Sequence, residues 1–137
     1  MITVGWHKLM GRYYDGTIYG KFWFGVQSSD DASNFKSEDL GKKPYHFTGR
    51  YIIYNFEKSE LIFIQDKLKS LEISIGEDII TNLNYKLENY WGEYEVNYSA
   101  LKGIDKTIEE LVARYCLGKH IEKALIAINE CYIKCEV

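Results

Sequence analysis

Proline is almost missing from this chain of 137 residues, which contains one, and its scarcity argues against linkers and disordered tails. Long hydrophobic runs are missing too. No stretch reaches the roughly 18 apolar residues of a membrane-spanning helix, so we expect no membrane partner. Because Trp6, His7 and Lys8 interrupt the first apolar residues, we expect no signal peptide. The sequence therefore predicts a single folded domain over residues 1–137.

An excess of positive charge is also lacking. The chain has 17 Lys and Arg against 20 Asp and Glu, a net charge of −3, so no general basic field attracts nucleic acid, and we do not expect it as a partner. Cysteine is scarce and odd in number, with three residues that all lie at or after Cys116. This pattern favours free thiols in a reducing, intracellular location.

Aromatic residues are abundant by contrast: 12 tyrosines, three tryptophans and six phenylalanines. Tyrosine has an apolar ring and a polar tip, so it suits both a core and a wet binding surface. The most unusual stretch is residues 20–35, where three aromatic residues and two glycines are followed by a polar segment.

The N-terminal part shows the period of two that is typical of strands. Residues 2–8 alternate, and Asp15-Gly16 within residues 13–18 is a hairpin signal that leads into a strand over residues 17–27. The predicted core face of that strand consists of Ile18, Phe22, Phe24 and Val26, and the opposite face of Tyr19, Lys21, Trp23 and Gln27. Residues 27–35 read as a polar loop. Residues 45–56 read as a central strand covered on both faces, because neither face is cleanly apolar.

Helical spacing begins after a possible Ser59 cap and gives four predicted helices. They cover residues 61–71, residues 80–91 before Gly92, residues from about 105 to Gly118, and residues 121–135. Strands followed by helices indicate an α+β fold. We predict an antiparallel sheet of three to five strands in the N-terminal part, packed with about four helices from the C-terminal part.

Two patterns resemble catalytic or metal sites but fail on closer reading. Cys116-x3-His120 and Cys131-x3-Cys135 have zinc-type ligands, but a helix over residues 119–135 would hold the pairs roughly 16 Å apart at about 1.5 Å per residue. His46-Phe47-Thr48 resembles half of the paired His-x-Thr motif of two-histidine phosphoesterases, and no second copy is present. We therefore predict no metal and no cofactor.

The segments Tyr13-Tyr14-Asp15-Gly16 and Gly-Lys-Phe-Trp-Phe-Gly-Val-Gln-Ser-Ser-Asp-Asp-Ala, at residues 20–32, resemble a motif of small uncharacterised proteins of large DNA viruses. No activity comes with this resemblance, so it assigns no functional residue. It implies a viral origin and a location in the cytoplasm of an infected cell.

The leading hypothesis is a non-enzymatic binding protein that recognises a nucleotide-like small ligand or a host protein. Aromatic rings beside Lys or Arg can stack planar groups and pair with phosphate. The predicted binding residues form an aromatic and basic sheet face with a rim loop: Tyr19, Lys21, Trp23, Ser28, Asp30, Asp31, His46 and Arg50.

Two further hypotheses stay open. A hydrolase or transferase acting on a phosphorylated or nucleotide substrate would use His46 with Asp30 or Asp31, provided that these groups meet in a cleft. A homo-oligomeric structural protein would also suit the tyrosine content.

Overall fold

The computed structural model describes residues 11–37, 45–83, 86–87 and 89–137. The strand predicted over residues 2–8 lies outside these ranges. The strands are β1 (Tyr13–Gly16), β2 (Gly20–Lys21), β3 (His46–Phe47), β4 (Tyr51–Glu57) and β5 (Glu130–Glu136). The α-helices are α2 (Leu61–Ile75), α3 (Glu77–Asn82) and α4 (Lys106–Ile128), and three short 3₁₀ helices are η1 (Asp31–Phe35), η2 (Lys58–Glu60) and η3 (Tyr98–Leu101).

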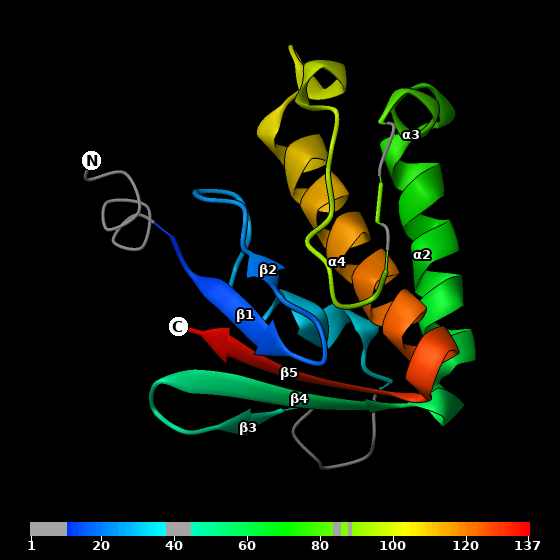
Figure 1. The fold of residues 1–137 in the computed structure, drawn as a ribbon. Coiled ribbons are helices and arrows are strands. Elements are labelled where there is room, and N and C mark those ends of the chain that lie inside the picture. The colour runs from blue at the N-terminus through cyan, green and yellow to red at the C-terminus, as the bar shows by residue number, and fades with distance from the viewer. Residues whose placement is uncertain (1–10, 38–44, 84–85, 88) are drawn as a thin grey trace.

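The five strands form one sheet in the order β2-β1-β5-β4-β3, and every pairing is antiparallel. The helices lie on one face of this sheet, as Figure 1 shows. The predicted α+β class with an antiparallel sheet is thus confirmed. The location of the strands differs from the prediction, because the central strand, β5, comes from the C-terminal end of the chain.

Strand alternation decides which sheet face meets the helices. Ile52, Tyr54 and Phe56 of β4 are buried, and the residues between them are more exposed. The prediction of a central strand covered on both faces is therefore wrong for residues 45–56. A turn at Gly49, with φ 91°, divides this segment into β3 and β4, and only the face toward the helices is covered.

The helix stripes expected from the sequence face the core where a helix forms. Ile64 and Leu68 of α2 are buried, as are Val112 and Tyr115 of α4. Glu57 and Glu60, rather than Ser59, form the capping box that precedes α2. The described residues contain three α-helices instead of about four, for three local reasons.

First, Gly118 does not end a helix. The helix α4 runs through it without a break. A Cβ atom at this position would collide with the Phe35 ring and would lie 2.8 Å from Leu68 Cδ2. Gly118 therefore allows α2 and η1 to approach α4 closely, which is a packing role that the sequence pattern does not distinguish from a helix stop.

Second, the predicted helix over residues 121–135 ends at Ile128. Asn129 adopts the left-handed conformation, with φ 68°, and closes α4. The next residues form β5, in which Cys131, Ile133 and Cys135 face the core. The helical spacing predicts that Ile121, Leu125 and Ile128 are all buried; Ile121 and Leu125 are, but Ile128 is 38% exposed.

Third, the predicted helix over residues 80–91 ends at Asn82. The Asn82 side chain donates to the Asp78 carbonyl, and the amide of Asn97 donates to the carbonyl of Leu83 at 3.1 Å. These bonds satisfy carbonyl groups near the helix end, so the chain can leave the helix before Gly92. Within the described ranges, no helix is both long and apolar enough to cross a membrane.

Candidate functional site

Aromatic side chains surround a surface hollow of about 300 Å³, which we call the Trp23 groove. Its walls come from the end of β2 and the turn that follows, from the segment 93–98, and from the first turn of α4. The lining residues are Lys21, Phe22, Trp23, Phe24, Glu93, Tyr94, Tyr98 and Glu109. The groove thus includes Lys21 and Trp23 of the predicted site.

A tight turn after β2 decides which aromatic residues reach the groove. The amides of Val26 and Gln27 donate to the Trp23 carbonyl at 3.1 and 2.9 Å, and Gly25 has φ 74°. Glycine adopts such a positive φ readily at the third position of a type II turn. The strand predicted over residues 17–27 therefore ends at Lys21, and Phe24 lies at the turn tip.

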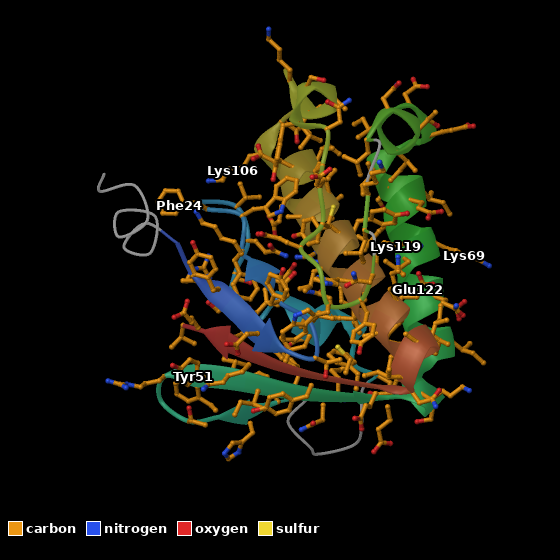
Figure 2. All side chains as sticks on the ribbon, in the orientation of Figure 1. Phe24, Tyr51, Lys69, Lys106, Lys119 and Glu122 are labelled. Carbon is orange, nitrogen blue, oxygen red and sulfur yellow. The ribbon has the colours of Figure 1, made fainter. Side chains whose placement is uncertain are left out.

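The turn corrects the prediction that Phe22 and Phe24 both point into the core. Phe22 is buried as predicted, whereas Phe24 is 64% exposed and lies at the edge of the molecule in Figure 2. Trp23 is partly buried between them. Its ring lies 5.5 Å from the Tyr98 ring, centroid to centroid, with the planes inclined at 51°.

A chain of hydrogen bonds connects Trp23 to a buried histidine. Trp23 Nε1 donates to Tyr94 Oη at 3.2 Å, a hydrogen bond links Tyr94 to Tyr14, and Tyr14 Oη lies 3.0 Å from His120 Nδ1. His120 Nε2 lies 2.9 Å from the carbonyl oxygen of Tyr90. Since a carbonyl can only accept, Nε2 donates to it, and the Tyr14 hydroxyl donates to Nδ1.

His120 is fully buried, and this burial lowers its pKa to about 4. Hydrogen bonds to the backbone at Tyr90 and Gly92 oppose the shift, and the charge of Lys123 adds to it. The imidazole is therefore neutral at neutral pH, as its acceptor role toward Tyr14 requires. We infer that it holds Tyr14, and through it Tyr94, beneath the groove.

Hydrogen bonds of the backbone hold the wall of the groove that residues 93–98 form. Lys86 and Glu95 exchange two of them, at 2.9 and 2.8 Å, and the Asn97 side chain accepts from the amide of Ser99 at the start of η3. Burial raises the pKa of both Tyr94 and Tyr98. Both phenols thus keep their protons at neutral pH and present neutral rings to the groove.

The charged groups give the groove an acidic character. Among the described residues that line it, two are acidic, Glu93 and Glu109, and one is basic, Lys21. The Lys21 ammonium lies 5.9 Å from the centroid of the Tyr13 ring, which belongs to the outer face of the sheet. Aromatic faces and carboxylates both attract cations, so this composition favours a positively charged ligand group over a phosphate.

The predicted rim loop is largely structural. Gln27 Nε2 donates to Asp31 Oδ2 at 2.8 Å, and Arg114 Nε donates to Asp31 Oδ1 at 2.8 Å. Arg12 donates to the Gln27 carbonyl and to Ser29 Oγ. Burial raises the Asp31 pKa, while the bonds from Gln27 and Arg114 oppose that shift. Both carboxylate oxygens of Asp31 therefore accept hydrogen bonds from within the protein.

Ser28 and Asp30, the remaining two residues of that loop in the predicted site, are exposed and bond to each other. Ser28 Oγ donates to Asp30 Oδ1 at 2.7 Å. Neither residue lines the Trp23 groove. Tyr19 lies apart from the groove lining as well, with its ring 5.2 Å from the Trp91 ring.

Two residues of the predicted site, Lys21 and His46, belong to strands and point to the outer face of the sheet, opposite the helices. Lys21 pairs with Tyr13, and His46 pairs with Ile53, so both point outward. They lie on opposite edge strands, β2 and β3, four strand spacings or about 19 Å apart. Arg50 is exposed in the turn before β4. The structure therefore does not bring the predicted binding residues to one point.

Tyrosines and charged residues also form a hollow of about 260 Å³ near the centre of the outer face. Lys134 Nζ lies 4.0 Å from the centroid of the Tyr51 ring, and Figure 2 marks Tyr51 on β4. The lining residues are Tyr13, Tyr14, Asp15, Tyr51, Lys134 and Glu136.

His46 and Asp31, which the enzyme hypothesis pairs, lie on opposite sides of the sheet. His46 is on the outer face, whereas the segment that holds Asp31 packs on the helix side, where Ser33 Oγ lies 2.7 Å from Tyr54 Oη. Among the residues described, no ion pair or hydrogen bond joins His46 to Asp30 or Asp31.

The three cysteines are free and buried, and burial raises the pKa of each thiol, to about 12 for Cys135. Cys131 and Cys135 lie on β5 rather than on a helix, so the helix-length argument against zinc does not apply. No group of three potential metal ligands occurs in the part of the chain that the structure describes.

Sequence reasoning missed most of the groove. Glu93, Tyr94 and Tyr98 come from a segment with weak periodicity, Glu109 lies on a predicted helix but off its apolar stripe, and the alternation of a strand predicts Phe24 in the core. The aromatic density of residues 90–98 was a usable signal. That residues 90–98 lie beside residues 20–35 depends on the tertiary fold and cannot be read from this signal.

A scan against protein-family models found no match, and searches of curated proteins and of solved structures found no similar protein.

Proposed function

We propose that this protein is a non-enzymatic binding protein whose Trp23 groove holds a compact organic cation, either a small molecule or a basic side chain of a partner. The observation that supports the proposal most is the association of five aromatic residues with two carboxylates around one hollow of about 300 Å³. A concave site favours a small group over a flat protein surface.

The contacts of Trp23 explain how the groove would recognise a cation. Its indole N–H is occupied by Tyr94, so the ring face rather than the N–H is available to the ligand. Tyr98, 63% exposed, forms a second wall at an angle to the first. Cations within about 6 Å of such ring faces gain about 0.5–2 kcal/mol, and Glu93 and Glu109 add charge attraction.

Titration calorimetry with choline and N-trimethyllysine tests the proposal. Tyr98→Ala should weaken binding about tenfold or more, because it removes one ring of the site. Trp91→Ala is the matched control, since Trp91 is 52% exposed and does not line the groove. It should bind like the unmodified protein.

The uncharged choline isostere 3,3-dimethylbutanol separates charge recognition from apolar burial. It should bind at least tenfold more weakly than choline. Equal affinities for the two compounds, or equal losses in both variants, would contradict the proposal.

A nucleotide-like ligand on the outer sheet face is the second candidate function. The hollow beside Tyr13, Tyr51 and Lys134 favours it, because a tyrosine ring can stack a base while lysine pairs with phosphate. In that case adenosine monophosphate should bind the protein, and Tyr51→Ala should abolish the binding without affecting choline.

An enzymatic function draws less support than either binding function. It requires His46 beside an acidic group such as Asp31, and these two residues lie on opposite sides of the sheet. A homo-oligomeric role stays a prediction, to be tested by native mass spectrometry. The resemblance of residues 20–32 to small proteins of large DNA viruses supports placing the partner in an infected cell.

A further inference from the structure

A further hollow, of about 180 Å³, lies between α2, α4 and η1 and shares no residue with the Trp23 groove. We call it the Lys67 cleft. Its lining residues are Asn34, Phe35, Lys67, Ser70, Leu71, Ser74 and Arg114. The inference drawn from it does not depend on the proposed function.

The geometry of α2 brings polar groups to this cleft. Lys67, Ser70 and Ser74 are three and four residues apart, so they form one stripe along the helix. That stripe flanks the core stripe that contains Leu68. The buried Phe35 ring forms an apolar base, because it fits against Gly118 of α4.

The cleft is rich in unused hydrogen-bond donors. Lys67 makes no ion pair with any described residue, and its ammonium lies 5.5 Å from the centroid of the Phe63 ring. Ser70 and Ser74 keep hydroxyl groups that make no side-chain hydrogen bond to a described residue. Arg114 bonds to Asp31 through Nε and to Glu110 through Nη2, which leaves Nη1.

The charge of the cleft follows from these contacts. No carboxylate is among the described residues that line it. Arg114 is paired with two carboxylates, those of Asp31 and Glu110, so Lys67 is the lining residue whose positive charge no ion pair with a described residue offsets. An ammonium, two hydroxyls and a guanidinium nitrogen are all groups that donate hydrogen bonds to oxyanions, and the exposed Lys67 side chain would join the others by turning from the Phe63 ring toward Ser70.

We propose that the Lys67 cleft binds a phosphate-type oxyanion, either inorganic phosphate or the phosphoryl group of a phosphate monoester. Lys67 provides the charge, Ser70 and Ser74 orient two oxygen atoms, and Arg114 bonds to a third. The apolar base formed by Phe35 and Leu71 limits the site to one such group.

The test is an NMR titration of the full-length ¹⁵N-labelled protein with sodium phosphate at pH 7 and constant ionic strength. The backbone amides of residues 67–74 and the Arg114 Nε–H signal should shift saturably. Lys67→Ala should weaken binding about tenfold or more, because it removes a charged hydrogen bond. O-phosphoserine and glycerol 3-phosphate in parallel titrations distinguish a free anion from a phosphoryl group on a larger molecule.

Lys69→Ala is the matched control. Lys69 is an exposed lysine on the same helix that does not line the cleft, and it points away from α4 in Figure 2. This variant should bind phosphate like the unmodified protein. The proposal fails if no signal saturates up to about 20 mM phosphate, or if both lysine variants lose affinity equally. Because both side chains are exposed, neither variant should unfold the domain.

Discussion

Neighbouring phenylalanines in the most unusual stretch of the sequence have opposite roles. The buried Phe22 ring lies 5.3 Å from the Tyr14 ring, centroid to centroid, and the Arg12 guanidinium lies over it at 5.3 Å from the centroid. Phe24 is exposed at the tip of the turn that Gly25 permits. An uninterrupted strand would have placed both side chains on one face.

This difference predicts the stability of two alanine variants. Phe22→Ala should lower the free energy of unfolding by about 3–5 kcal/mol, because it leaves a cavity in the core. Phe24→Ala should lower it by less than about 0.5 kcal/mol. Urea denaturation of the two variants gives the comparison, and a similar loss in both would show that residues 22–24 continue the strand.

The buried His120 predicts a dependence of stability on pH. The unfolded histidine binds a proton near pH 6.5, but the folded one does so only near pH 4. The unfolded state therefore holds more protons between these values, and stability falls as pH is lowered from 6.5 to 4. With about 1.4 kcal/mol per pKa unit, His120 accounts for a loss of about 3 kcal/mol.

Comparison with His120→Gln isolates this effect. The variant should be less stable at pH 7, because glutamine cannot replace both imidazole contacts, but it should lose less stability between pH 6.5 and 4. The raised pKa of Asp31 acts in the opposite direction and is present in both proteins. Parallel stability curves would mean that His120 is protonated, or accessible to water, in the folded state.

At the scale of elements, the sequence predicts best where a helix has one clear apolar stripe. The stripes of α2 and of the first half of α4 are confirmed. The strand β5 was missed because Cys131 and Cys135 are four residues apart, a spacing that fits one helical face and one strand face equally. The residue just before β5 is Asn129, which adopts the left-handed conformation. Asparagine is one of the residue types that end helices in this way, so its presence in the sequence is a local signal against a continuous helix.

The sequence predicts less of the Trp23 groove than of the helices, for a physical reason. Of the residues expected to bind a ligand, Lys21 and Trp23 line the Trp23 groove, but its facing wall comes from residues 93–98 and 109. No periodicity connects segments that far apart. The internal hydrogen bonds of Asp31 cannot be predicted from the sequence, because Gln27 and Arg114 both reach it only when η1 packs on α4.

Gly118 offers a test of how the elements pack. Glycine to alanine in an exposed helix stabilises by about 1 kcal/mol. At position 118 the added methyl group would collide with Phe35 and approach Leu68. Gly118→Ala should therefore destabilise the protein by about 1–3 kcal/mol in thermal or urea unfolding.

Ala127 on the same helix is the matched position with the opposite expectation. It is exposed, so Ala127→Gly should destabilise by about 1 kcal/mol through helix propensity alone. If Gly118→Ala stabilised the protein, α4 would be free of close contacts at that point, and the packing of α2 and η1 against it would be wrong.

At the scale of the whole molecule, the sheet separates two kinds of surface. The helix side contains the core and the chain of hydrogen bonds that connects Trp23 to His120. The outer side presents tyrosines among charged residues. The Trp23 groove lies where the chain leaves the edge strand β2 and meets α4, so the fold supports its aromatic walls from beneath.

Cation binding in the Trp23 groove is tested most directly by the response of individual indole N–H signals in NMR spectra to choline. In a ¹⁵N-labelled sample, Trp23→Phe and Trp91→Phe variants assign the two signals. If the groove binds choline, the Trp23 signal should shift saturably, because the Trp23 ring forms a wall of the groove, and the Trp91 signal should not shift. An unchanged Trp23 signal at choline concentrations up to about 50 mM, or an equal shift of both signals, would contradict cation binding in the groove.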